Sequence, residues 1–529
     1  MVSKTPIHNL DDDSLLQIFS CYRLEDEFNW YLRLWWLKLA RVCPRWRKLI
    51  YDSWTHLDMF LLLTYDSPQI DTLSHLPPLP LVIYYPDRTR TMARKDEDNI
   101  HIGLRQHGRV RHVVLRAPSS GLRLWLELMN KPFPRLEYLS LSSTTTGSEE
   151  MSLVAPKLLQ APRYLSLHGI GLPKGLSSLS STTALSTLSL TRIPESCYFS
   201  PAHLVTQLHS LPRLVELSIG FALPIPLPSG EGEPLSTPIP PVTMPNLRQF
   251  TFQGEDIYLD NVVAHINTPL LKRLSVTLLF DLVVTLENLT EYIQRTEGFG
   301  CHGLMAKVIF NKDGPTIHAN CYDQPGVGEL SLHVNCKPLD WQIDSAGQVC
   351  SALGEVLSAV KKLTLDLDVD GMPTNWENRL DRMLWHELLL PFIGVKKLHI
   401  GPSLTLELSR SLESISGGLV LELLPELEEL EVQLEMGHSK NAFSLFVETR
   451  ESVARPVHLS VPPSQQPIRP NNLTAMSEDR FKSDFLQFTR LKGIRLNERD
   501  LVIDGRRIDL WALHRAVRAG NGFESVRLQ

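Results

Sequence analysis

The chain has 529 residues, 43% of them hydrophobic and 21% charged, and a formal net charge of −6. This length exceeds what a single compact core usually holds, so it predicts several domains or one extended repeat domain. An acidic chain without clustered cations argues against nucleic-acid binding, which needs positive charge to displace the counterions of phosphates.

Targeting signals and disulfides are not expected. No stretch approaches the ~18 consecutive apolar residues of a membrane span. Residues 11–13 are acidic where a secretory signal would need an apolar run. The seven cysteines are scattered and include no C-x-x-C pair, which is typical of reduced thiols. We therefore expect a cytoplasmic or nuclear protein that binds no membrane.

Residues 1–60 are predicted to form a small helical module. The acidic run at residues 11–13 suits the start of a helix, where free N–H groups favour negative charge. A second apolar stripe at helical spacing is interrupted by Pro44, so two helices should meet near Cys43, with Pro44 in the first turn of the second. Two sets of apolar residues follow helical spacing: Leu15, Ile18, Phe19 and Tyr22, and then Trp35, Leu39, Val42, Trp46 and Leu49.

This module is too rich in tryptophan to bury all its apolar surface by itself. Five tryptophans fall within 25 positions: Trp30, Trp35, Trp36, Trp46 and Trp54. Some of them must pack either on the rest of the chain or on a partner, and the pattern alone leaves both readings open.

Two apolar runs in the module resemble an F-box, in particular the F-box of families expanded in mushroom-forming (basidiomycete) fungi. The first is Leu10 followed by Leu15-Leu16-x-Ile18-Phe19, and the second is Leu39-x-x-Val42-Cys43-x-x-Trp46. Asp11 stands where that family usually has a proline. The resemblance implies that the module binds a Skp-type adaptor protein. The implied adaptor-binding residues are Leu10, Leu15, Leu16, Ile18, Phe19, Val42, Cys43 and Trp46.

Residues 61–108 resemble the connector of those fungal proteins, which implies a segment that packs on a following repeat domain. In physical terms we expect a helix with an apolar stripe at Ile100 and Leu104, followed by a strand from Val110.

From residue 109 onward a short motif, which we call a phrase, occurs eleven times. In each phrase apolar residues alternate with other residues, and this alternation predicts a strand. Successive phrases lie 23 to 35 residues apart, except for a gap of 56 between Leu274 and Leu330 that holds another strand-like run at 306–310. The phrases are marked by Val113, Leu139, Leu165, Leu188, Leu217, Phe250, Leu274, Leu330, Leu363, Leu398 and Leu430.

Helix-like stretches separate many of these strands, at 201–208, 262–266, 286–293 and 349–360. A repeated strand plus helix or turn predicts an irregular leucine-rich-repeat-like α/β solenoid over 109–529, with its strands along one concave side. The rival is an ordinary doubly wound α/β domain. Proline-rich loops are expected at 223–245 and 456–472, and a last repeat or cap at 491–496 and 508–519.

Two motifs match chemical signatures in letters but not in context. Asp366, Asp368, Asp370 and Glu377 fit a calcium loop, yet they follow an alternating, strand-like run, so we favour a solvated acidic strand face over a metal site. Gly298-x-Gly300-x-x-Gly303 matches a dinucleotide fingerprint, but the helix comes before it and the strand after it, which is the reverse of the required order.

No catalytic constellation such as G-x-S-x-G or a P-loop is present, so we expect a non-catalytic protein without a cofactor. The F-box resemblance implies a substrate-recognition subunit of an SCF-type cullin–RING ubiquitin ligase. It would bind a Skp-type adaptor, and through it a cullin, with the helical module, and an unidentified protein target with the repeats. The alternatives are a non-ubiquitin interaction scaffold whose helices only cap the solenoid, and a small-molecule or metal-binding α/β protein.

Overall fold

The computed structural model divides the chain into two units, residues 1–460 and 461–529. In the second unit only the short strands β19 (Val502–Ile503) and β20 (Arg506–Arg507) are described, and they pair antiparallel. The residues that the structure describes are 10–21, 35–65, 67, 78–86, 92–145, 151–153, 158–159, 162–172, 175–179, 182–222, 240–279, 286–299, 305–320, 328–336, 339–368, 382–413, 422–433, 443–460, 502–503 and 506–507.

The first unit is mixed α/β. Its described α-helices are α1 (Asp12–Cys21), α2 (Trp35–Ala40), α3 (Pro44–Asp52), α4 (Arg94–Arg105), α5 (Ser119–Leu128), α6 (Pro201–Leu208), α7 (Asp256–Val263), α8 (Glu287–Arg295), α9 (Leu339–Ala352), α10 (Gly354–Leu357), α11 (Arg382–Leu389), α12 (Thr405–Glu413) and α14 (Ser444–Ser452). Short 3-10 helices are η5 (Gly175–Leu179), η6 (Glu195–Cys197), η7 (Glu297–Phe299) and η8 (Pro402–Leu404).

Sixteen strands form one large sheet, in the order β1-β2-β3-β4-β5-β6-β7-β9-β11-β14-β13-β12-β15-β16-β17-β18. They are β1 (Leu61–Leu63), β2 (Leu81–Tyr85), β3 (Val110–Ala117), β4 (Tyr138–Ser143), β5 (Tyr164–His168), β6 (Thr187–Ile193), β7 (Glu216–Phe221), β9 (Gln249–Gly254), β11 (Arg273–Leu279), β12 (Met305–Asn311), β13 (Gly314–Asn320), β14 (Glu329–Asn335), β15 (Lys362–Leu367), β16 (Lys397–Ile400), β17 (Glu429–Val432) and β18 (His458–Ser460). A separate parallel pair joins β8 (Val242–Thr243) and β10 (Ile266–Asn267).

All eleven phrases marked in the sequence lie in strands of this sheet, so the strand predictions are confirmed. Their apolar residues also share one register: Val113 pairs with Leu139, Leu139 with Leu165, and the series continues as far as Leu330. These side chains are almost completely buried, which explains why alternation in the sequence marked them so clearly.

One part of the sheet departs from sequence order. Strands β12 and β13 form an antiparallel hairpin that lies between β14 and β15, so neighbouring strands of the sheet follow the order β11-β14-β13-β12-β15. This hairpin accounts for the gap of 56 residues between phrases. The strand predicted at 306–310 is confirmed as β12, but the hairpin and the reversed order were not predicted.

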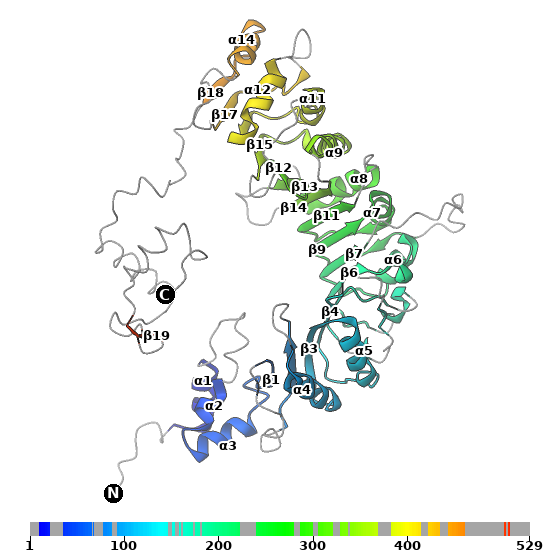
Figure 1. The fold of residues 1–529 in the computed structure, drawn as a ribbon, viewed down its shortest axis with the longest axis vertical. Helices are drawn as coiled ribbons and strands as arrows, with labels where there is room; N and C mark the ends of the chain where they lie inside the picture. The colour runs from blue at the N-terminus through cyan, green and yellow to red at the C-terminus, as the bar shows by residue number, and fades with distance from the viewer. Residues whose placement is uncertain are drawn as a thin grey trace. The chain divides into compact units, whose positions relative to one another are not determined.

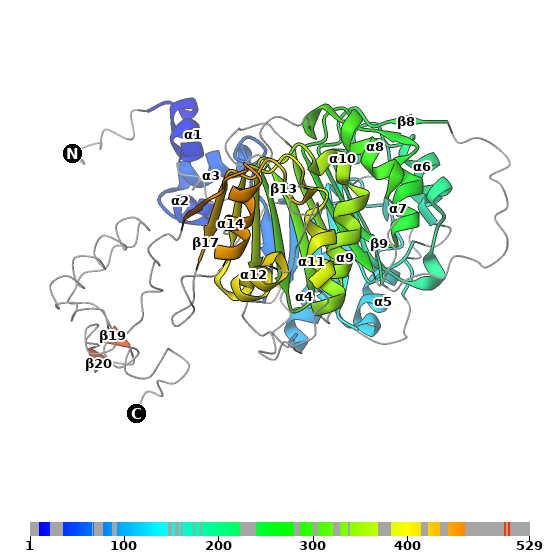
Figure 2. The same cartoon turned by 90° about the horizontal axis from the view of Figure 1, so that it is seen from above.

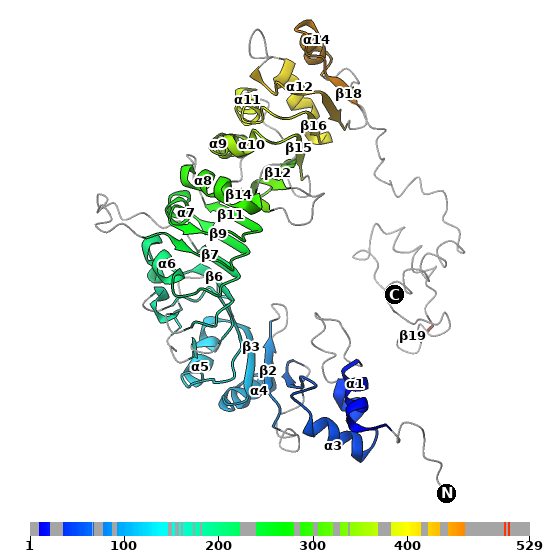
Figure 3. The same cartoon turned by 180° about the vertical axis from the view of Figure 1, so that it is seen from behind.

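The helices cover one face of the sheet. Figures 1 and 3 show α5, α6, α7, α8, α9 and α11 on the same side of the strands, and Figure 2 shows this layer from above. On the other face of strands β3 to β17 none of the described helices lies, and every second residue there is half-buried or exposed. The fold is therefore a large, mostly parallel sheet with one covered face.

The N-terminal helices begin as the sequence predicts. The side chain of Asp11 accepts a hydrogen bond from the backbone N–H of Ser14 at 2.7 Å, and this donor lowers the pKa of Asp11. Pro44 is the first residue of α3, and the Sγ of Cys43 accepts from the backbone N–H of Trp46 at 3.5 Å. Asp11 thus caps α1 at the position where the F-box family usually has proline.

Several boundaries differ from the expectations. The segment 61–108 supplies β1 and β2 to the same sheet as the repeats, in addition to the predicted helix, which is α4. Short strands occur within both proline-rich segments, β8 in 223–245 and β18 in 456–472. The bounds of the helix expected at 262–266 are wrong: α7 covers Asp256–Val263, and Ile266 lies in β10. The expected cap at 491–496 and 508–519 lies outside the described residues.

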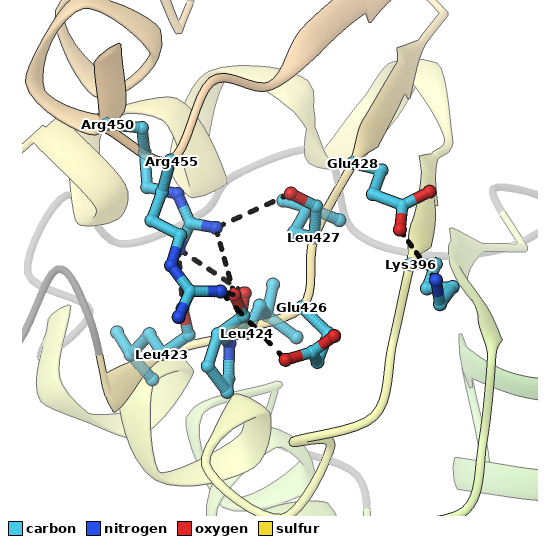
Figure 4. Close-up of polar contacts among 9 residues, drawn as sticks. Lys396, Leu423, Leu424, Glu426, Leu427, Glu428, Arg450 and Arg455 are labelled. Carbon is cyan, nitrogen blue, oxygen red and sulfur yellow. Dashed lines mark hydrogen bonds and ion pairs between the residues drawn. The ribbon is translucent and has the colours of Figure 1, made fainter. Parts of the chain in front are cut away.

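The loop that precedes β17 is held by a buried arginine. Arg450 of α14 is 0% exposed, and its guanidinium donates to the carbonyl oxygens of Leu423 and Leu424, both at 3.3 Å. It also reaches the carbonyls of Pro425 and Leu427. Figure 4 shows this guanidinium pointing into the loop that precedes β17.

Candidate interaction surfaces

Helices α1 and α3 are joined by an aromatic pair. The rings of Phe19 and Trp46 meet edge to face, with centroids 4.8 Å apart. Around them Arg45 donates to the carboxylate of Asp12 at 2.7 Å and to the carbonyl of Leu10 at 2.7 Å, which fixes the start of α1 on α3. In α2, Trp36 is 0% exposed and packs edge-on to Tyr51 of α3.

The eight predicted adaptor-binding residues fall into three groups. Leu15 and Phe19 are 0% exposed and belong to the core of the first unit. Leu10, Leu16, Cys43 and Trp46 are half-buried. Ile18 and Val42 are 47% and 60% exposed, so their side chains face solvent. In this arrangement the buried pair holds the helices together, and the exposed pair is free to meet a partner.

The turn after α3 and the beginnings of the parallel strands enclose a pocket of about 580 Å³. Since a strand begins at the same edge of a parallel sheet in each repeat, residues just before β2, β4, β5 and β6 converge there with Arg111 at the start of β3. The pocket is lined by Trp54, Thr55, Asp58, Met59, Pro80, Arg111, Pro134, Arg135, Leu136, Glu137, Arg163 and Ala184.

The charge of one of the three arginines in this pocket is balanced by two carboxylates of the same pocket. Arg111 donates to Asp58 at 2.5 Å and to Glu137 at 2.9 Å. Burial opposes its charge, but these two carboxylates together raise the pKa of Arg111. Arg135 and Arg163 are exposed, and neither side chain has an ion pair among the described residues.

These cations belong to a longer row at the amino-terminal edge of the sheet, which we call the basic edge. Each member lies one to three residues before a parallel strand, is exposed, and forms no ion pair within the part of the chain that is described. The basic edge consists of Arg135, Arg163, Arg213, Arg248, Lys272 and Lys361. Sequence reasoning missed it because its members are far apart in the chain. The available signal was a basic residue directly before a repeated phrase, as at Arg163, Arg248, Lys272 and Lys361.

The uncovered face of the sheet carries a row of small hydroxyl residues at one register. They are Ser140, Ser166, Ser189, Ser218, Thr251, Ser275 and Ser331. Beside this row the rings of Tyr138 and Tyr164 stack with centroids 3.9 Å apart. This face therefore offers small polar groups next to an aromatic platform.

The acidic motif begins in a strand, as the alternation before it predicts. Asp366 is in β15, and its carboxylate pairs with the Nζ of Lys307 on β12 at 3.2 Å. Asp368 is exposed, whereas Asp370 and Glu377 lie outside the described residues. Among the described residues no three His, Cys, Asp or Glu side chains gather as metal ligands. In the glycine motif, α8 and η7 precede the described β12, in the order that the sequence predicts.

Among the described residues five cysteines are free thiols: Cys21, Cys43, Cys197, Cys336 and Cys350. Within the described residues, the helices are too short or too polar to cross a membrane. Comparison with models of known protein families gives no match, and comparison with curated proteins gives none either.

Proposed function

We propose that this chain is a non-catalytic substrate-recognition subunit of an SCF-type cullin–RING ubiquitin ligase. Helices α1 to α3 would bind a Skp-type adaptor, and the repeats, as a leucine-rich-repeat-like solenoid, would hold a protein target. Such a subunit works by tethering. It keeps a target lysine at high effective concentration near a ubiquitin-conjugating enzyme held by the same complex, so it needs no reactive group of its own.

The observation that supports adaptor binding most directly is the exposure of Ile18 and Val42. Their side chains remain 47% and 60% exposed, although the adjacent Phe19 is buried, and a bound adaptor would cover them. The Phe19–Trp46 pair supports this reading, because it fixes α1 on α3 and so presents Ile18 from a rigid helix.

Co-purification with a Skp-type adaptor tests the proposal. The double variant Ile18→Ala with Val42→Ala should lose the adaptor while its thermal unfolding stays unchanged, because both side chains are exposed. The matched control is Gln17→Ala with Arg41→Ala, which changes two exposed neighbours and should retain the adaptor. Unchanged adaptor capture by the first double variant would refute this interface.

A second candidate is an interaction scaffold whose helices only cap the repeats. It is favoured by the bonds from Arg111 of β3 to Asp58, which tie the turn after α3 to the sheet. The same experiment separates the two functions. If the unmodified chain captures no Skp-type adaptor, and replacing Asp58 by Asn lowers the unfolding temperature of the repeats, the capping role is the correct one.

A further inference from the structure

We propose that the pocket between the turn after α3 and the starts of β3 to β6 binds an acidic, extended peptide segment of the protein target. The glutamate or aspartate side chains of that segment would pair with Arg135 and Arg163, and one of its apolar side chains would lie against Trp54. This inference rests on the target-binding half of the proposed function and adds the chemical class of the target.

The charge at the pocket points to an anionic partner. Arg111, Arg135 and Arg163 line it together with Asp58 and Glu137, and both carboxylates are already bonded to Arg111. Arg135 and Arg163 are therefore left facing the same cavity without a carboxylate of this chain among the described residues. A guanidinium with free N–H groups binds a carboxylate through charge-assisted, often bidentate hydrogen bonds.

Among the described residues, the excess of unpaired positive side chains continues along this edge of the sheet. Beyond the pocket, Glu329 is held by Arg273 at 3.0 Å, and Glu216 lies beside the hydroxyl of Thr187 at 3.5 Å. Arg248, Lys272 and Lys361 follow at the starts of β9, β11 and β15. Although the chain as a whole has a net charge of −6, this edge thus presents a line of cations.

The spacing of these cations suits an extended chain. Strands β5 and β9 are separated by three steps across β6 and β7, which is about 14 Å at the usual distance between strands. An extended peptide covers that distance with about four to five residues. A segment with acidic residues at this separation would therefore reach Arg163 and Arg248 at once.

The apolar part of the pocket favours a peptide over nucleic acid. Met59 and Leu136 are each 1% exposed and form part of its wall, while Trp54 is half-buried at the same cavity. An aliphatic or aromatic side chain gains by burial against such a wall. A phosphate backbone has no equivalent apolar group to place against Trp54.

The experiment is fluorescence anisotropy with the full chain and a fluorescein-labelled peptide of about 12 residues that has glutamate at every fourth position and leucine and glycine between the glutamates. The control peptide has glutamine in place of every glutamate. The double variant Arg135→Gln with Arg163→Gln should bind the acidic peptide at least about tenfold more weakly. The matched control is Arg94→Gln with Lys95→Gln, which removes the same charge from the exposed first turn of α4 and should bind like the unmodified chain.

Three results would overturn the inference. The first is equal affinity of the unmodified chain for the acidic and glutamine peptides, and the second is equal affinity of the two double variants for the acidic peptide. The third is a single-stranded oligonucleotide that binds the unmodified chain as tightly as the acidic peptide does and that loses the same affinity on Arg135→Gln with Arg163→Gln. Adaptor capture is measured in parallel with the same proteins. If the unmodified chain captures the adaptor but does not bind the acidic peptide, this inference alone is refuted, whereas peptide binding by an unmodified chain that captures no adaptor refutes the ligase role alone.

Discussion

Phe19 of α1 and Trp46 of α3 meet edge to face with their ring centroids 4.8 Å apart, and this contact joins the first and third helices of the chain. Phe19 is 0% exposed, whereas its neighbour Ile18 is 47% exposed on the same helix. Two adjacent apolar residues, equivalent in a hydrophobicity pattern, thus have opposite roles: one packs the helices and the other faces solvent.

Replacing Phe19 by Ala should therefore loosen the N-terminal helices. Loss of a buried phenylalanine leaves a cavity and typically costs about 3–5 kcal/mol. We expect faster amide hydrogen exchange throughout α1 and α3, measured by mass spectrometry on the full chain. Ile18→Ala should leave exchange in both helices unchanged. Equal exchange in both variants would show that the aromatic pair does not hold the helices together.

The strands were predictable because their signal is local. Each phrase buries alternate residues, such as Leu165 and Leu167, and the neighbours in register repeat the same pattern, so periodicity alone located the strands. Helix starts at Asp12 and Pro44 were equally predictable, because the chemistry of capping is confined to a few residues.

The pocket and the reversed hairpin depend on relations that periodicity does not contain. Arg135 and Arg163 come together only because two parallel strands begin at the same edge, and the turn at 53–59 closes the pocket from a different part of the chain. A parallel and an antiparallel strand also show the same alternation, so β13 could not be oriented from its pattern. The exposure of Ile18 against the burial of Phe19 required the packing of α3.

Two histidines at this hairpin predict a response to acid. Burial lowers the pKa of His318 and of His333 below the ordinary value of 6.5, although Glu329 and Asp313 partly oppose the shift. The unfolded chain therefore takes up protons first as the pH falls through 6.5, so the hairpin loses stability below that pH and not above it.

Amide exchange in β13 and β14, corrected for its intrinsic pH dependence, should accelerate between pH 7.5 and about 5.5. The double variant His318→Gln with His333→Gln should show a much smaller change over this range. Substituting His203, which is half-exposed on α6, should leave the response as it is. A pH response that persists in the double variant would assign it to other groups.

The turn of the same hairpin requires glycine. Gly314 has φ of +141°, and a Cβ atom there would collide with the backbone carbonyl oxygen of Val334. Asn311 supports the turn by accepting hydrogen bonds from the backbone N–H groups of Asp313 and Gly314. Both the steric clash and the strained backbone oppose any other residue.

Gly314→Ala should consequently separate β13 from β14 while leaving β3 to β7 intact. We expect loss of exchange protection confined to β12, β13 and β14. Gly108→Ala is a suitable control, since a Cβ atom at that glycine has nothing within 4 Å. Protection of β13 equal to that of the unmodified chain would contradict the geometry assigned to this turn.

The guanidinium of Arg450 stabilises the loop before β17 in a way that lysine cannot reproduce. It meets four carbonyl oxygens, and one of the residues that it holds, Leu424, has a left-handed backbone with φ of +50°. Burial lowers the pKa of Arg450, so the surrounding carbonyls must compensate for the lost hydration of its charge. Figure 4 shows Arg455 approaching the same loop from nearer the surface.

Replacing Arg450 by Met keeps much of the volume but removes every donor, so the buried carbonyls lose their partners, at about 1–3 kcal/mol for each group left unsatisfied. Arg450→Lys should also destabilise the loop, because an ammonium group has only three N–H donors for four carbonyl oxygens. Arg455→Gln should have little effect, since Arg455 is about half exposed and its bond to Pro425 is at the surface. Urea unfolding followed by exchange in β17 and α14 measures all three. Methionine retains the apolar part of the contact and loses only the hydrogen bonds. If Arg450→Met has the same free energy of unfolding as Arg455→Gln, the packing of α14 and not the guanidinium therefore holds this end of the sheet.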